Sequence, residues 1–162
     1  MKFLLMISSI FVSAILTSSF SYAHTHGHKE HSVIVQNPVI KTTPPGINNT
    51  AAYLHIKNNS DQDIALVKAE SDIAQLVEIH EHTMNNGLML MQKVESITIP
   101  ANSFIEFKPG GYHIMFINLN STISPDQKVE INLTFSNGMK QSITAIAVEQ
   151  VKSSTHKMHK HH

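Results

Sequence analysis

Regular alternation of apolar and polar residues, broken by turn signals, is the feature that most constrains how this 162-residue chain can fold. The clearest example runs from Val129 to Phe135, where every second residue is apolar and the residues between them are polar. Side chains alternate between the two faces of a β-strand, so this run predicts a strand that is buried on one side. No window of the sequence has a convincing helical period, and we therefore expect an all-β protein.

The remaining apolar runs are short and are separated by Pro, Gly, Asn and Asp, which favours short strands joined by turns. We expect strands near residues 32–40, 51–58, 64–69, 73–82, 112–119 and 140–148, shorter ones near 97–99 and 104–107, and a hairpin turn at Asn85-Asn86-Gly87. Such a series predicts a β-sandwich or a Greek-key barrel, and the pattern alone does not choose between them.

The two ends of the chain differ from this β-rich middle part. Lys2, the apolar run 3–16 and the small residues Ser21 and Ala23 have the form of a secretory signal. We therefore predict cleavage after Ala23, which would leave no stable membrane anchor. We expect a signal peptide at residues 1–23 and a disordered His-rich tail at residues 24–31. One β-domain should follow at residues 32–150, and a disordered His/Met-rich tail at residues 151–162.

Charge and cysteine content argue against several classes of function. Lys and Arg total 12 and Asp and Glu total 12, so the chain shows no electrostatic footprint for nucleic acid. Cysteine is absent, which excludes disulfides and a lipid anchor on cysteine. It also argues against the alternative of a blue-copper electron carrier, whose site needs a thiolate. No Ser-His-Asp or paired-carboxylate arrangement stands out. A copper enzyme that uses an N-terminal histidine is a further alternative, but we expect a protein that is not an enzyme.

Histidine and methionine are interleaved between His80 and Met91 and again between His113 and Met115. Imidazole is a borderline ligand and a thioether is soft and uncharged, so this combination favours copper, and Cu(I) in particular. Zinc more typically recruits Cys, His or carboxylates, and magnesium and calcium need clustered oxygen ligands. His113 and Met115 would lie on one face of a strand because they are two residues apart.

The spacing of four of these residues is specific. Ten residues separate His80 from Met91, twenty-one separate Met91 from His113, and one lies between His113 and Met115. This His-x10-Met-x21-His-x-Met pattern, with the runs TAAYLHIKN, LVEIHEHTMNNGLMLMQKV and PGGYHIM, closely resembles the periplasmic copper chaperone family written PCu(A)C. The resemblance covers roughly residues 32–148. It implies a cupredoxin-like barrel that binds Cu(I) through those four side chains.

The resemblance also implies a periplasmic metallochaperone and its partners. These would be the CuA domain of cytochrome c oxidase subunit II, thioredoxin-like copper assembly proteins, or both. The alternative is a periplasmic copper-buffering or resistance protein in which the tails do the main work, because His-rich tracts usually bind metal. Under either hypothesis, possible secondary metal ligands, with Cu(II) as a candidate ion, are expected in the tails at His24, His26, His28, His156, Met158, His159, His161 and His162.

Other residues near the four-residue pattern have alternative interpretations. His82 shares a strand face with His80, but the family pattern does not use that position, and we interpret it as a rim residue. Met84 and Met89 compete with Met91 for the sulfur role, although methionine is normally core filler. Only Met91 lies at the required spacing. His55 is interpreted as an ordinary strand histidine.

Overall fold

The computed structural model describes residues 32–149, which form ten β-strands without a helix among them. No segment of this described part is therefore a helix long and apolar enough to cross a membrane. The signal segment and both His-rich tails lie outside it, as does residue 150. The predicted all-β class and strand positions are confirmed. The strands are β1 (Val33–Lys41), β2 (Thr50–Asn58), β3 (Ile64–Glu70), β4 (Ala74–Asn85), β5 (Leu88–Lys93), β6 (Ile97–Ile99), β7 (Phe104–Phe107), β8 (His113–Leu119), β9 (Lys128–Phe135) and β10 (Lys140–Val148).

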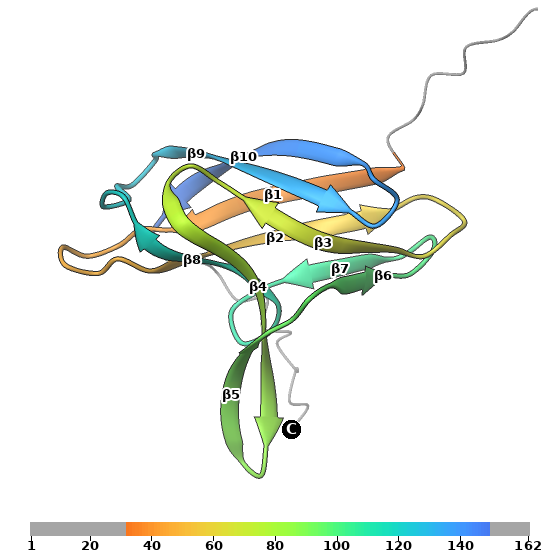
Figure 1. The fold of residues 1–162 in the computed structure, drawn as a ribbon, viewed down its shortest axis with the longest axis horizontal. Helices are drawn as coiled ribbons and strands as arrows, with labels where there is room; N and C mark the ends of the chain where they lie inside the picture. The colour runs from red at the N-terminus through yellow and green to blue at the C-terminus, as the bar shows by residue number, and fades with distance from the viewer. Residues whose placement is uncertain (1–31, 150–162) are drawn as a thin grey trace, which may run out of the picture.

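The strands belong to one sheet that curves around a common interior, with a hairpin of β4 and β5 projecting from it (Figure 1). The order across the sheet is β5-β4-β8-β2-β1-β10-β9-β3-β6, and β7 pairs with β2 beside this path. β1 and β10 are parallel, whereas the other paired strands are antiparallel. The sheet is open, because the path begins at β5 and ends at β6 and these two strands are not paired with each other.

Strand alternation explains how the core forms. In β9 the apolar residues from Val129 to Phe135 are each at most 1% exposed, while Glu130 and Asn132 between them face solvent. Ile114 and Phe116 on β8 are fully buried in the same way. Each large apolar side chain that leaves water contributes about 1.5–3 kcal/mol, so the interior rows of the strands stabilise the barrel together.

β4 is the strand that leaves the barrel. From Ala74 to His80 it pairs with β8, and from His80 to Asn85 it pairs with β5. The turn between β4 and β5 places Asn86 at φ 48° and Gly87 at φ 80°. Positive φ at both central residues suits a two-residue hairpin, so the predicted turn is confirmed. All six residues of β5 are exposed, which means that the hairpin contributes little to the core.

Candidate metal site

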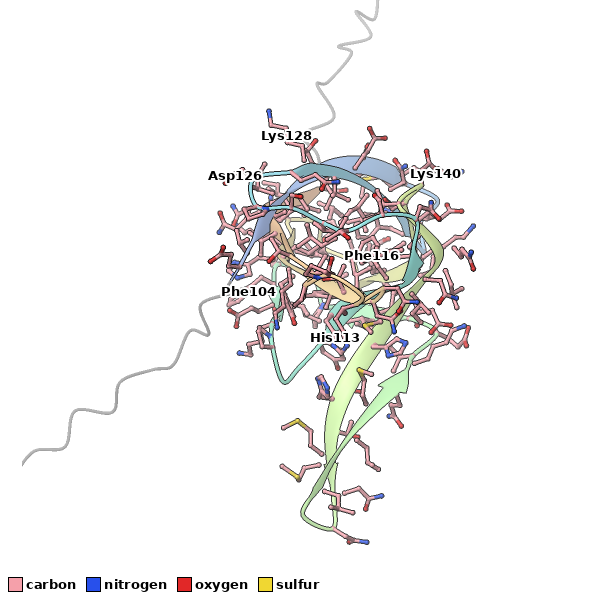
Figure 2. All side chains as sticks on the ribbon, turned by 90° about the vertical axis from the view of Figure 1, so that its left-hand side faces the viewer. Phe104, His113, Phe116, Asp126, Lys128 and Lys140 are labelled. Carbon is pink, nitrogen blue, oxygen red and sulfur yellow. The ribbon has the colours of Figure 1, made fainter. Side chains whose placement is uncertain are left out.

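The two histidines predicted as metal ligands lie opposite each other on neighbouring strands. His80 on β4 and His113 on β8 are cross-strand partners, and their ring centroids are 5.7 Å apart. They are 8% and 2% exposed. His80 also pairs with Lys93 on β5, so it is the residue at which the barrel and the hairpin meet. Figure 2 shows His113 at the end of the barrel from which the hairpin projects.

Met91 approaches this histidine pair from the hairpin. Its sulfur lies 3.3 Å from Nε2 of His113, and its cross-strand partner on β4 is His82. The side chain is 49% exposed, so it is not acting as core filler. The structure thus brings three of the four predicted ligands together: His80, Met91 and His113.

Met115 lies two residues beyond His113 on β8, on the predicted face of that strand. It stands opposite Glu78 of β4 and Ala51 of β2, and it is half-buried. Alternate residues of a strand are roughly 7 Å apart, so the backbone of Met115 lies about that far from His113, on the barrel side of the histidine pair. Met91 flanks the same pair from the hairpin side.

A hydrogen bond to the backbone sets the chemical state of His113. Its Nδ1 donates to the carbonyl oxygen of Gly111 at 3.0 Å, and the backbone N–H of His82 donates to the same oxygen at 3.2 Å. A carbonyl can only accept, so Nδ1 carries the proton and Nε2 presents its lone pair toward Met91. Burial lowers the pKa of His113, the bond to Gly111 opposes this, and the neighbouring His82 and His80 lower it further.

A hydrogen bond to Glu78 fixes which ring nitrogen of His80 carries the proton. Nε2 of His80 donates to Oε2 of Glu78 at 2.8 Å, and Oε1 of Glu78 is 3.2 Å from Nζ of Lys93. The hydrogen bond from His80 is the main cause that lowers the pKa of Glu78; burial opposes it and Lys93 adds to it. Nδ1 of His80 is then the lone-pair nitrogen, and it is buried without a hydrogen-bond partner. A metal ion would satisfy this otherwise unfavourable atom.

His82 is the neighbour that the family spacing does not include. Its ring stacks on that of His113, with centroids 4.8 Å apart and 23° between the planes. Its Nδ1 is also buried without a hydrogen-bond partner. In the sequence, strand alternation indicates that His82 lies on the same face as His80. The four-residue spacing, by contrast, assigns His82 no role.

Thioether sulfur is needed to complete a site here. Among residues 32–149, no group of three or more His, Asp or Glu side chains is arranged to hold a metal ion. The lone-pair nitrogens of His80 and His113 and the nearby sulfur of Met91 instead offer a mixed set of nitrogen and sulfur donors, and Met115 is its predicted fourth member. Such donors suit a soft ion and are a poor match for magnesium or calcium.

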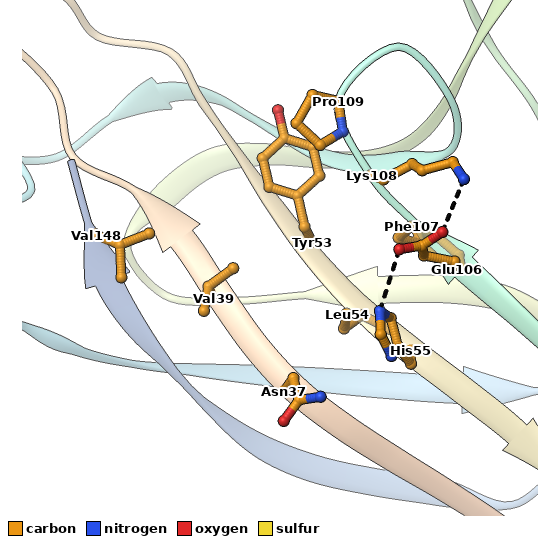
Figure 3. A pocket seen from close by; sticks show the side chains of 10 residues that line it. All are labelled: Asn37, Val39, Tyr53, Leu54, His55, Glu106, Phe107, Lys108, Pro109 and Val148. Atoms are coloured by element: carbon orange, nitrogen blue, oxygen red, sulfur yellow. Dashed lines mark hydrogen bonds and ion pairs between the residues drawn. The ribbon is translucent and has the colours of Figure 1, made fainter. Parts of the chain in front are cut away.

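A separate depression of about 290 Å³ lies beside the site, and Figure 3 shows its lining. Here Nε2 of His55 is 3.4 Å from Oε1 of Glu106, and Nζ of Lys108 donates to Oε2 of the same carboxylate at 2.7 Å. Tyr53 contributes to the wall, and its ring centroid is 6.5 Å from that of His113. His55 and Lys108 both contact the carboxylate of Glu106, which agrees with an ordinary structural role for His55.

Comparison with known proteins gives a family for this chain. Residues 33–148 match the family model described as "Putative lipoprotein LpqE-like". The chain is 34% identical over 117 residues to the "Putative lipoprotein Lxx21020" of Leifsonia xyli subsp. xyli (strain CTCB07). That alignment covers 72% of this chain and 69% of the relative.

Comparison with solved structures gives the fold. The solution structure of "CuI-DR1885" from Deinococcus radiodurans is 29% identical, with a TM-score of 0.63, and the match covers 80% of this chain and 87% of that one. The "Copper-bound PCuAC domain from PmoF2" has a TM-score of 0.62 at 18% identity, over 72% of this chain and 92% of that one. The predicted cupredoxin-like fold is thereby confirmed.

Proposed function

The chain belongs to the LpqE-like family, and we propose that it is a copper metallochaperone that binds Cu(I) through His80, Met91, His113 and Met115. One observation carries the proposal. Nε2 of the buried His113 lies 3.3 Å from the sulfur of Met91, beside a buried and unpartnered Nδ1 of His80. Two solved structures with this fold are described as a copper-bound and a Cu(I) form, which supports copper as the ion.

The donor set fits Cu(I) on chemical grounds. Thioethers are soft and neutral and need not lose a proton to bind, so only the two histidines couple binding to pH. Glu78 and the carbonyl of Gly111 hold the rings with the correct nitrogen free. Hydrogen-bonding partners of this kind orient metal ligands and raise their basicity.

The position of the site supports delivery of the ion rather than permanent retention. Met91 is half-exposed, and the segment from Thr83 to Met91 contains no charged residue. An acceptor can therefore approach the ion from the hairpin side and replace ligands one at a time. We propose no catalytic role for this site.

The proposed acceptor is the CuA domain of cytochrome c oxidase subunit II, with or without a thioredoxin-like copper assembly protein. The proposal rests on the resemblance to PCu(A)C proteins. It places the mature chain in the periplasm after cleavage at Ala23. The name of the Leifsonia relative, a putative lipoprotein, is consistent with a location outside the cytoplasm.

The proposal is tested by Cu(I) affinity and transfer in the purified mature protein. Replacing both sulfurs, in Met91→Ala with Met115→Ala, should weaken Cu(I) by orders of magnitude in competition with a Cu(I) chelator. Leu88→Ala with Leu90→Ala removes exposed apolar surface from the other face of the hairpin and should leave the affinity unchanged. Unchanged affinity in the methionine variant, or failure to load a soluble CuA domain, would contradict the proposed role.

A copper-buffering or resistance protein is the second candidate, because eight of the twelve histidines lie in the two tails. The residues that would bind copper there lie outside the described part of the chain. Truncation after Val151 removes the C-terminal group and should lower copper stoichiometry while the Cu(I) affinity of the barrel site stays the same. Buffering is favoured if deletion of the protein reduces copper tolerance but not oxidase activity, and delivery is favoured by the reverse.

A further inference from the structure

Two methionines near the tip of the hairpin form a pair that the proposed site does not use. Met84 on β4 and Met89 on β5 are cross-strand partners. They are 67% and 59% exposed, so neither fills the core. Side chains directly opposite each other have Cβ atoms about 4.5–5.5 Å apart, close enough for both sulfurs to reach one ion.

This pair continues the face on which the proposed ligands lie. Alternate residues of a strand lie on the same face. On β4 these include His80, His82 and Met84, and on β5 they include Met89 and Met91. His82 faces Met91 and is the diagonal neighbour of Met89, within the reach of long side chains. The hairpin and its sulfur atoms are seen in Figure 2, extending beyond the barrel.

The environment of the His82 ring is a second observation that supports metal binding at the hairpin. Its Nδ1 is buried and has no hydrogen-bond partner, although the ring lies at the base of an exposed hairpin. Stacking on His113 places the ring beside the proposed site. In the tautomer with the proton on Nε2, the Nδ1 lone pair of His82 is available to an ion that moves from His113 toward the tip.

The methionines and the leucines of the hairpin lie on opposite faces of its two strands. Met84 and Met89 share one face, whereas Leu88 and Leu90 pair with Asn85 and Thr83 on the other. Leucine and methionine are close in volume, so a surface that only docked a partner would not need this separation. Ligation of one ion by both sulfurs does require that the two methionines share a face.

We propose that Met84, Met89 and His82 form an outer Cu(I) site, which takes the ion from the inner site and presents it at the exposed end of the hairpin. The inference rests on the proposed function. Transfer proceeds by exchange of neutral donors: His82 joins the ion as His113 and Met91 leave it, and the two outer sulfurs follow. Copper remains Cu(I) throughout, so no electron or proton has to be supplied.

The test follows the methionine methyl groups of the full mature protein by NMR, with selective ¹³C labelling and anaerobic addition of Cu(I) to saturation. The methyl signals of Met91 and Met115 should shift first, and those of Met84 and Met89 should shift as more Cu(I) is added. If Met91 and Met115 shift and the other two stay in place, the outer site is wrong and the inner one stands. If all four stay in place, both proposals fail.

Kinetics provide an independent test. Met84→Leu with Met89→Leu keeps the apolar surface and removes both sulfurs, so it should slow Cu(I) transfer to a chelator several-fold while the affinity of the inner site is retained. Leu88→Ala with Leu90→Ala is the matched control and should not alter the rate. Equal rates in the wild type and the double leucine variant would overturn the relay.

Discussion

The barrel and the β4–β5 hairpin differ in what holds them in place. In the barrel, alternate residues of β2, β8 and β9 are buried in one cluster. In the hairpin, every residue of β5 is exposed, and the segment beyond His82 is held by backbone pairing between two strands. A two-stranded ribbon without other support is only marginally stable in water.

This difference explains why the barrel and the hairpin supply different kinds of ligand to the candidate site. The barrel supplies His80 and His113, which are buried and oriented by Glu78 and Gly111. The hairpin supplies Met91, which is half-exposed and contacts the barrel site through its sulfur. Rigid nitrogens and a more accessible sulfur suit an ion that must be held and then given up.

The largest expected effect concerns the barrel. Phe116→Ala empties a fully buried position, and such losses cost about 3–5 kcal/mol of unfolding free energy. Leu88→Ala on the hairpin should change it by less than about 0.5 kcal/mol, because that side chain is 68% exposed. Urea unfolding of both variants measures the contrast. Similar losses would mean that the hairpin belongs to the cooperative core.

Loss of the carboxylate behind His80 should weaken the site without affecting the core. Glu78→Ala removes the acceptor of the His80 N–H, and losing such a partner typically lowers metal affinity about 10–100-fold. Glu78→Gln keeps an acceptor and should recover part of that loss. Chelator competition measures both variants, and full affinity in the alanine variant would show that Glu78 does not orient the ring.

Acid should weaken Cu(I) binding through the barrel histidines. Burial lowers the pKa of His113, so its Nε2 lone pair persists to lower pH than that of a free imidazole, whose pKa is about 6.5. The affinity should therefore hold near neutrality and decline at pH values below about 6.5. The metal-free protein should also lose stability there, because the unfolded chain binds more protons than the folded one. A flat affinity profile from pH 7.5 to 5 would assign the ion to sulfur alone.

The smallest expected effect is on the outer face of the hairpin. Leu88→Ser with Leu90→Ser exchanges exposed apolar groups for polar ones, and each change should alter stability by no more than about 0.5 kcal/mol. Cu(I) affinity should be unaffected, since neither side chain lies on the ligand face. Thermal unfolding and chelator competition measure the two quantities. A marked loss of affinity would show that the hairpin must be packed to position Met91.

Much of the fold was predictable because a half-buried β-strand requires apolar and polar residues to alternate along the sequence. The alternation from Val129 to Phe135 and the Asn86-Gly87 turn each depend on neighbours only a few residues away. The spacing that links His80, Met91 and His113 was visible in the same way, and the structure gathers these three. The stacking of His82 on His113 was not visible, because it depends on the register between β4 and β8.

The sequence by itself determined the class of fold, the turns and the choice of soft donors, since these follow from local periodicity and from residue chemistry. Tertiary structure alone decided which nitrogen of each ring is free, because the bonds to Glu78 and Gly111 depend on side-chain direction and backbone path. It also decided that β4 leaves the barrel at His80, where pairing with β8 ends and pairing with β5 continues. Buried histidines and exposed methionines meet there because one strand belongs to both regions.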